Sequence, residues 1–366
     1  MLGLSNWGTG AHTRGVEVSV GSARTGRRGL VMAMLAVALL CAMVVSLCLG
    51  EVAIRPSQVI AILARHLGWP KPASFDLSQD EVLWSLRLPR VLLGALVGCC
   101  LGLAGTALQG LLRNPLADPA ILGSSAGATF GTVLMLLLGG SGLGLAAMLP
   151  AASIGGLAAT GAVYAVALNQ GRADILTMVL AGIAVNAIVA GVIGLLIAAT
   201  NNPALDSVSF WELGSLSGAT WDEVVAAAPL ALAGLLVLLR WARPLNLLSI
   251  GERDAHYLGL PVGRTRLILL AVASMLTAVT VATAGIIGFV GLIVPHLMRS
   301  LLGPDHAGIL PASALTGALL VVLTDLLART AAAPAEIPLG SLTALLGCPF
   351  FLWLLRHSHI LRAQGQ

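Results

Sequence analysis

Charged residues are scarce in this sequence. Asp, Glu, Lys and Arg make up only 10% of its 366 residues, whereas a soluble domain carries roughly 25%. Hydrophobic residues make up 57%, and the mean hydropathy is +0.95. Runs without charge that are long enough to cross the ~30 Å hydrocarbon core as helices recur along the chain. These features exclude a soluble globular domain and predict an all-α, polytopic membrane protein.

Lysine is almost absent, which excludes one source of energy. The only lysine is Lys71, which lies between Pro70 and Pro72. A nucleotide-binding P-loop needs the pattern GxxxxGK[ST], whose lysine reaches the terminal phosphates of ATP. We therefore predict that this chain does not hydrolyse ATP and is not an enzyme.

Acidic residues are missing from the interiors of the apolar runs. All sixteen lie in loops or at the ends of runs, and Asp325 is the closest to being buried. Asp325 precedes Arg329 by four residues, and a local ion pair at a helix end is the simpler interpretation of that spacing. A proton- or sodium-coupled carrier needs a carboxylate near mid-membrane. An ion-coupled secondary transporter is therefore the remote alternative, and we expect energy to come from another polypeptide.

Patterns that bind metals, cofactors or nucleic acid are also missing. The five cysteines lie inside apolar segments without metal-ligand or disulfide spacing, so we interpret them as small buried hydrophobes. No cluster of His, Asp and Glu lies within the apolar runs, which argues against an intramembrane enzyme. The pI of 9.1 reflects arginines in loops, where membrane topology explains them. We expect no cofactor or metal in this chain, and no nucleic acid as a partner.

The apolar runs predict about ten transmembrane helices. We place them at residues 29–49, 91–112, two within 120–171, 175–199, 224–239, two within 267–298, 309–327 and 339–355. The transmembrane domain therefore covers residues 29–356, between a tail at 1–28 and a tail at 357–366. Fourteen of the 20 basic residues fall on the side of the N-terminus, which predicts that both termini are cytoplasmic.

Glycines recur at every fourth position on both sides of one polar loop. The spacing predicts a groove of bare backbone along each helix, where another helix can approach closely. The loop between the two helices contains Asn114, Pro115 and Leu116, and Pro115 ends the first helix. The groove glycines are Gly94, Gly98, Gly102, Gly123, Gly127 and Gly131.

This stretch carries a family resemblance. RLPR at 87–90 is followed by GxxLxxxGxxLQGLLRNPLADP and LGSSAGA, and later by GIIGFVGLIVPHLMRSLLGPDH and PAEIPLGSLTALLGCPFFLWLLR. In this order the motifs resemble the FecCD permease family, the membrane subunits of bacterial ABC importers for iron chelates, haem and cobalamin. The resemblance covers residues 29–356.

The resemblance implies a fold and a set of partners. The fold is that of a type II ABC importer permease with ten helices. Two copies form a homodimer in the bacterial inner membrane, within the lipid bilayer. Two ATPase subunits bind ATP and Mg²⁺ at the cytoplasmic side, and a periplasmic binding protein delivers the substrate.

The resemblance also implies roles for individual residues. Arg87 and Arg329 meet acidic residues of the binding protein. Two cytoplasmic gates are formed by Asn114 and Leu116, and by Asp174, Ile175 and Leu176. Spans five and ten face the central path, and Asn186, near the middle of span five, either lines that path or hydrogen-bonds a neighbouring helix.

The charged loop at 240–266 is the expected contact with the ATPase. Its sequence predicts a short helix from Ser249 to Leu258 that ends at Gly259, with a second turn after Pro261. This helix–glycine–helix pattern resembles the coupling elements of the family. The contact residues that it implies are Glu252, Arg253, His256, Leu258, Gly259 and Leu260.

The substrate is expected to be haem. LAGIAVNAI with FWELGSLSGATW, and GPDHAGILPASALTG with DLLART, are similar to the haem branch of the family. Cobalamin permeases tend to carry small hydroxyl residues where this chain has residues 174–176, which disfavours cobalamin. A ferric siderophore is the main alternative.

Overall fold

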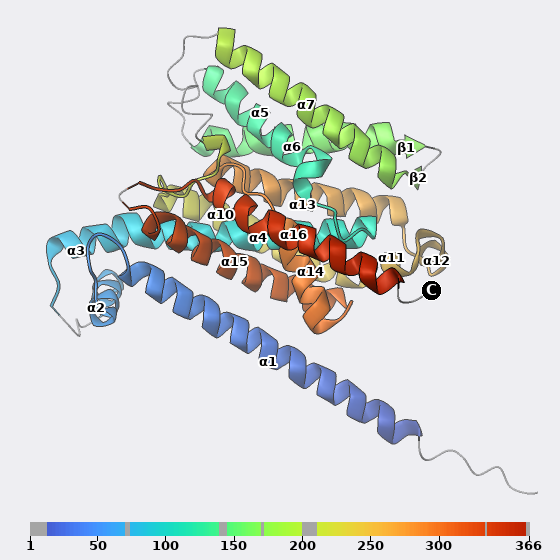
Figure 1. Cartoon of the computed structure of the whole chain (residues 1–366), viewed down its shortest axis with the longest axis horizontal. Coiled ribbons are helices and arrows are strands. Elements are labelled where there is room, and N and C mark those ends of the chain that lie inside the picture. The colour runs from blue at the N-terminus through green and yellow to red at the C-terminus, as the bar shows by residue number, and fades with distance from the viewer. Residues whose placement is uncertain are drawn as a thin grey trace, which may run out of the picture.

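The computed structural model is a helical bundle (Figure 1). It describes residues 13–69, 74–138, 145–169, 172–199, 211–333 and 335–363. In that part of the chain the only strands are β1 (Leu168–Asn169) and β2 (Arg172–Ala173), which pair antiparallel in one hairpin. Most of the predicted tail at 1–28 and all of the tail at 357–366 lie outside the residues whose side chains are described.

Ten apolar helices correspond to the ten predicted spans. Seven contain a stretch long and apolar enough to cross a membrane, and three are shorter. They are α1 (Thr13–Cys48), α4 (Leu88–Leu112), α5 (Ser124–Leu137), α6 (Leu145–Ala167), α7 (Ile175–Ala199), α10 (Trp221–Arg240), α13 (Val262–Ala284), α14 (Val290–Leu302), α15 (His306–Thr330) and α16 (Leu339–Ala363). The prediction of an all-α polytopic membrane protein is therefore confirmed.

Short elements connect these helices at the two ends of the bundle. In Figure 1, α2 (Pro56–His66) and α3 (Leu77–Glu81) lie at one end. At the opposite end lie α11 (Ala242–Ile250), α12 (Glu252–Tyr257) and the β1–β2 hairpin. The C-terminal end of α16 is on the same side as α11 and α12 (Figure 1). The charged loop and both hairpin strands therefore share one end of the molecule.

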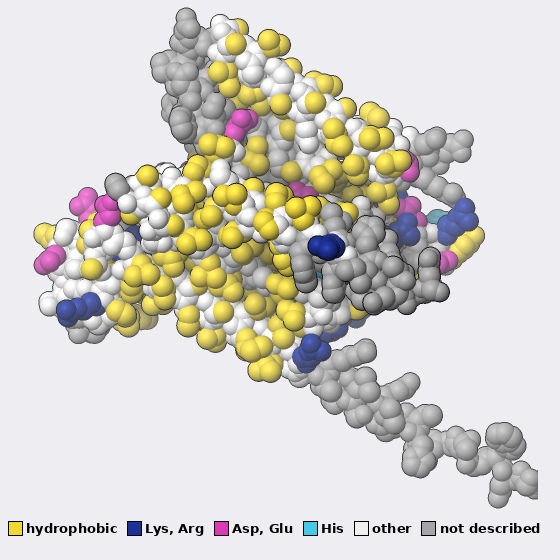
Figure 2. Space-filling model, in the orientation of Figure 1, with side chains coloured by type: hydrophobic (Ala, Val, Ile, Leu, Met, Phe, Trp, Pro, Cys, Tyr) yellow, Lys and Arg dark blue, Asp and Glu magenta, His cyan; other side chains and the backbone are white. Residues whose placement is uncertain are grey.

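Helix α4 is the centre of the bundle. Most of its side chains are buried, and α10, α13, α14 and α15 all pack against it. By contrast, α7 is mostly exposed and packs on α5, α6 and the 3-10 turn η2 (Pro119–Leu122). Helix α1 packs mainly on α15, and in Figure 1 it lies on the side of the bundle opposite α7. Hydrophobic side chains cover the flank that faces the viewer in Figure 2.

The glycines of the two grooves lie at helix–helix contacts. A Cβ atom on Gly98 would overlap the Gly317 carbonyl of α15, and one on Gly102 would overlap the carbonyl of Ser313. On α5, Gly127 and Gly131 face the backbone of α6 in the same way. Glycine is required at these positions because the facing backbones occupy the volume of a side chain. The groove positions Gly94 and Gly123 instead face the side chains of Leu216 and Val185.

The second span begins earlier than the sequence indicated. We expected it at residue 91, but helical structure is continuous over Leu77–Leu112, through α3, the π-helical segment Val82–Arg87 and α4. Pro89 directly follows the π-helical segment, in which the Leu88 N–H bonds to the Leu83 carbonyl oxygen, and the helical rod continues across it. Arg87 and Arg90 are therefore on one helical rod with the glycine groove.

A glycine-rich break separates α13 from α14, as the sequence predicted. Gly285 has a φ of 71° and Phe289 has a φ of 66°, so the chain turns sharply between the two helices. Gln109 of α4 reaches into this break, and its Nε2 donates to the carbonyl oxygen of Leu292 at 3.0 Å. The same Nε2 lies 3.4 Å from the carbonyl oxygen of Gly291, which lacks a helical partner because Pro295, four residues later, has no N–H.

The glycine contacts give a test of the central packing. Gly98→Ala is expected to destabilise the fold by about 1–3 kcal/mol, because the new methyl group forces α4 and α15 apart. The matched control is Gly161→Ala on α6, where a Cβ atom meets nothing within 4 Å. Thermal unfolding of the two purified variants in detergent measures the difference, and equal melting temperatures would contradict this account of the packing.

Candidate functional site

The first predicted gate is a rigid turn at the end of α4. Arg113 takes a left-handed conformation with a φ of 49°, which ends the helix. The Oδ1 of Asn114 then accepts a hydrogen bond from the Leu116 N–H at 2.9 Å. Asp118 caps η2 by accepting from the Ala120 N–H at 2.8 Å. Leu116 is half-buried, so a short, internally bonded loop holds an apolar side chain at this end of the bundle.

The second predicted gate is the turn that starts α7. The Asp174 carboxylate accepts hydrogen bonds from the side-chain and backbone donors of Thr177, at 2.6 and 2.9 Å. The hydrogen bond from the Thr177 hydroxyl lowers the pKa of Asp174 most, and the bond from the Thr177 N–H lowers it further. Ile175 is half-buried and Leu176 is exposed.

Contacts between α7 and η2 connect the two turns. The Asn186 Nδ2 of α7 donates to the Ala120 carbonyl oxygen at 2.9 Å. Nearer the start of α7, a Cβ atom on Gly182 would overlap the Ile121 carbonyl. Since η2 directly follows the Asn114 loop, a movement of α7 acts on both turns.

Asn186 also lines a cavity, and its place on the central path stays a prediction. The cavity has a volume of about 220 Å³, and Ser125, Thr129 and Glu212 contribute polar groups to its wall. The Asn186 Oδ1 is buried and has no hydrogen-bond partner in the described part of the chain. Asn186 therefore borders a small cavity whose wall mixes polar and apolar side chains.

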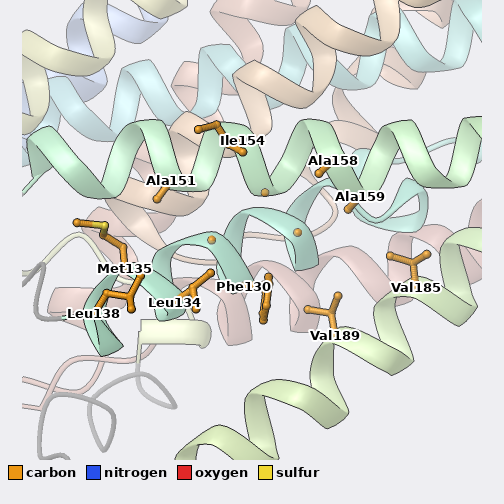
Figure 3. Close-up of a pocket in the computed structure, with 13 residues that line it drawn as sticks. Phe130, Leu134, Met135, Leu138, Ala151, Ile154, Ala158, Ala159, Val185 and Val189 are labelled. Atoms are coloured by element: carbon orange, nitrogen blue, oxygen red, sulfur yellow. The ribbon is translucent and has the colours of Figure 1, made fainter.

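A second cavity beside α7 is apolar. It has a volume of about 410 Å³ and lies between α5, α6 and α7. Figure 3 shows Phe130 and Leu134 of α5, Ala158 and Ala159 of α6, and Val189 of α7 around it. None of its thirteen lining residues, all from described segments, has a polar side chain. Such a surface contacts flat or aliphatic groups and offers no side-chain hydrogen bond.

The charged loop contains two short helices, α11 and α12, before α13 begins at Val262. The expected helix from Ser249 to Leu258 is interrupted at Gly251, whose φ of 145° ends α11 and starts α12. Gly259 has a φ of 86°, as expected for a residue that ends a helix and turns the chain. The break after Ile250 makes a compact corner in which α12 projects from the bundle (Figure 1).

The corner presents apolar side chains at an end of the molecule that is otherwise polar. Ile250, Tyr257 and Leu258 are 63%, 85% and 64% exposed. Arg253 and His256 are exposed beside them, and Leu260 is half-buried. Exposed apolar groups rimmed by charge are typical of a protein–protein contact.

Two polar clamps fix this corner to the bundle. Glu252 of α12 forms an ion pair with Arg266 of α13, a residue that is only 2% exposed. The Arg266 guanidinium lies 6.0 Å from the ring centroid of Tyr164, so it also contacts α6. Glu252, which we predicted to contact the ATPase, thus has a partner inside its own chain.

The second clamp joins α11 to α15 and α1. The Asn246 amide donates to Asp305 at 2.7 Å and accepts from the His306 N–H at 2.9 Å. Arg28 of α1 donates to the other Asp305 oxygen at 2.7 Å. Burial raises the pKa of Asp305, but the hydrogen bonds from Asn246, Ala307 and Arg28 outweigh burial and lower it. The sequence analysis did not find either clamp.

Arg87 and Arg329 make their contacts within the chain. Arg87 is 7% exposed and donates to the carbonyl oxygens of Leu47, at 2.8 Å, and Val52, at 2.6 Å. Arg329 donates to the Leu49 carbonyl oxygen at 2.8 Å and to both oxygens of Ser46. Both arginines cap the C-terminal end of α1, so docking of a binding protein through them stays a prediction that requires these bonds to open.

The ion pair that we predicted for Asp325 has a different main partner. Arg329 approaches Asp325 only to 3.8 Å. Arg90 of α4 instead donates to both Asp325 oxygens, at 2.9 to 3.2 Å, and to both oxygens of Glu336. Asp325 is buried and neutralised by a residue 235 positions away, and it joins α15 to α4.

Comparison with known proteins identifies the family. The FecCD transport family matches residues 38–357, which is most of the chain. The chain belongs to the FecCD transport family. Its relatives include the cobalamin import system permease protein BtuC of Halobacterium salinarum, with 39% identity over 97% of this chain and 96% of that protein. The hemin transport system permease protein HmuU of Yersinia pestis is 42% identical over 77% of this chain and 86% of that protein.

Solved structures agree with this assignment. A structure described as a metal-chelate type ABC transporter in an inward-facing conformation matches with a TM-score of 0.77 and 31% identity, over 90% of this chain and 99% of that one. PsaBC from Streptococcus pneumoniae, with a TM-score of 0.55 and 21% identity over 75% and 92% of the two chains, shares the fold. The chain is therefore the membrane-spanning permease subunit of an ABC importer, and ATP is hydrolysed by a separate subunit.

The contacts of Arg87 give a test that separates folding from docking. Arg87→Gln is expected to destabilise the isolated permease by about 2–3 kcal/mol, because it leaves the α1 carbonyls without their donor. The control is Arg65→Gln, which breaks an exposed pair with Asp80 and is expected to cost at most about 1 kcal/mol. Thermal unfolding is measured without any binding protein, and an unchanged melting temperature for Arg87→Gln would show that this arginine does not stabilise the fold.

The corner at Gly259 gives a second test. Gly259→Val puts a β-branched side chain at a positive φ, which should distort the turn after α12. Co-purification of the ATPase and substrate uptake are expected to fall while membrane insertion is unchanged. Gly263→Val, on the exposed face of α13 where φ is helical, is the matched control. Normal ATPase binding by Gly259→Val would exclude this corner as the coupling contact.

Proposed function

We propose that this permease imports haem into the cytoplasm from a periplasmic binding protein. The observation that carries the proposal is the apolar cavity between α5, α6 and α7 (Figure 3). The porphyrin ring is flat and apolar, and it suits walls made of Phe130, Leu134 and Val189. The 42% identity to a hemin permease supports the same substrate class.

The complex would be a homodimer in the inner membrane. Helix α7 is largely exposed and carries no charged residue, which suits a helix that faces the partner copy and the central path, together with α16. Both termini and the α11–α12 corner would then be cytoplasmic. This agrees with the excess of arginine on that side and with the position of α11, α12 and the end of α16 at one end of the bundle (Figure 1).

Two ATPase subunits would bind the α11–α12 corner. The exposed side chains of Ile250, Tyr257 and Leu258 supply the apolar contact, and Arg253 and His256 supply polar contacts around it. Glu252 would act indirectly, since its ion pair with Arg266 transmits force from α12 to α13. The gates would be Asn114 with Leu116, and Asp174 with Ile175 and Leu176, because both turns lie at the same end as this corner.

Cobalamin is the second candidate substrate. Its amide groups are hydrogen-bond donors, and they would bond to the unpaired Asn186 Oδ1 beside the smaller cavity once that buried atom becomes accessible. The cobalamin permease of Halobacterium salinarum also matches nearly the whole chain. A ferric siderophore, whose peripheral groups are similarly polar, would use the same acceptor.

Uptake by proteoliposomes decides between these substrates. The permease is reconstituted with its ATPase and binding protein, and haemin, a ferric siderophore and cobalamin are offered in turn with ATP. Haemin is expected to accumulate, and Val189→Asn should lower its uptake several-fold by placing an amide in the apolar wall. Leu236→Asn, the same kind of change at an exposed position of α10 that lines neither cavity, is the control. Uptake of cobalamin or the siderophore without haemin would overturn the haem assignment.

A further inference from the structure

A hollow with a basic rim lies where α1 joins the bundle. It has a volume of about 430 Å³ and is formed by Arg27 and Arg28 of α1, by Ser300 of α14, and by the turn at 301–305 that leads into α15. Figure 2 shows basic side chains at the place where α1 leaves the described surface. Asp305, one of its lining residues, is hydrogen-bonded to Asn246 of α11, so the hollow adjoins the α11–α12 corner.

The hollow carries uncompensated positive charge. Its one carboxylate, Asp305, is fully used, because Arg28, the Asn246 amide and the Ala307 N–H occupy its two oxygens. Arg27 is exposed and forms no ion pair with any described residue. The Ser300 hydroxyl donates to the His296 carbonyl oxygen and keeps its own lone pairs towards solvent. The free donors at the rim therefore come from the arginines, whose guanidinium groups suit a phosphate.

The flank next to the hollow is apolar and exposed. Leu30 and Met34 continue along α1, and Leu297 and Leu301 continue along α14. Between the two helices, Met32 and Leu35 pack against α14 and α15 and make an apolar floor. Figure 2 shows that hydrophobic side chains adjoin the basic rim. The hollow is thus at the boundary between the hydrocarbon-facing flank and the polar end of the permease.

We propose that this hollow binds the headgroup of an anionic phospholipid. The phosphodiester would contact the guanidinium groups of Arg27 and Arg28, and the acyl chains would run along the α1–α14 flank past Leu30 and Leu297. Basic pockets between helices on the cytoplasmic side have this chemistry in general. A soluble phosphate would contact the arginines but would make no contact with the apolar flank.

The bound lipid would also stabilise the junction that holds the coupling corner. Arg28, Asp305 and Asn246 connect α1, α15 and α11 in one chain of hydrogen bonds. A phosphate on the outer side of Arg28 holds this side chain in place, so lipid binding resists separation of α1 from α15. We expect the melting temperature of the permease to rise with phosphatidylglycerol more than with phosphatidylcholine.

Binding of a tail-labelled fluorescent phosphatidylglycerol to the full-length permease in neutral detergent tests the proposal. Unlabelled phosphatidylglycerol is expected to displace the probe at least fivefold better than phosphatidylcholine does. Arg27→Gln should weaken binding about fivefold, as expected for one arginine near a phosphate. Ser300→Trp, which fills the hollow without changing charge, should weaken it as well.

Arg264→Gln is the matched control. Arg264 is exposed on the same side of the bundle, at the start of α13, and its replacement removes the same charge outside the hollow. Equal losses for Arg264→Gln and Arg27→Gln would mean that general surface charge attracts the lipid and would overturn the site. Displacement of the probe by inorganic phosphate at the same concentration as by lipid would assign the hollow to a soluble anion. Equal binding of the two lipids would exclude an anionic headgroup site.

Discussion

The close approach of α4 and α15 is the contact on which the rest of the structure depends. In a bilayer the hydrophobic effect does not drive helices together, so van der Waals packing between backbones must do so. Gly98 against Gly317 and Gly102 against Ser313 bring the two backbones into direct contact. Helices α10, α13 and α14 then pack around α4, and the Gln109 amide joins it to the break before α14.

Buried polar side chains fasten the ends of this frame. Arg87 holds the end of α1, Arg90 joins α4 to α15 through Asp325, and Arg266 joins α13 to α12 through Glu252. Breaking such a buried pair leaves a charge without a partner, which costs about 3–5 kcal/mol. Helix α7 is joined to η2 by the hydrogen bond from Asn186 to the Ala120 carbonyl oxygen.

The sequence predicts local features of this protein well and long-range ones poorly. Ten spans, the glycine grooves and the break at residues 285–289 follow from runs and spacings within one segment. The partners of the arginines cannot be predicted from such local patterns. Arg90 and Asp325 are 235 residues apart in the sequence, and Arg28 and Asp305 are 277 residues apart. The predicted helix from Ser249 to Leu258 runs through Gly251, where a φ of 145° instead separates α11 from α12.

Membership of the family implies that a separate ATPase subunit supplies the energy for transport. In the proposed function, the two cavities bear on the choice of substrate. Val185 and Val189, four residues apart, face the apolar cavity, while Asn186, Ala190 and Ile193 face the polar one, with Val189 at the border of both. Helical periodicity therefore divides α7 into an apolar stripe and a stripe with a hydrogen-bond acceptor. A porphyrin would make more favourable contacts with the apolar stripe, and an amide-bearing ligand would make them with the stripe that contains the acceptor. If the proposed function holds, selectivity would depend on a few α7 positions outside the α4–α15 contact.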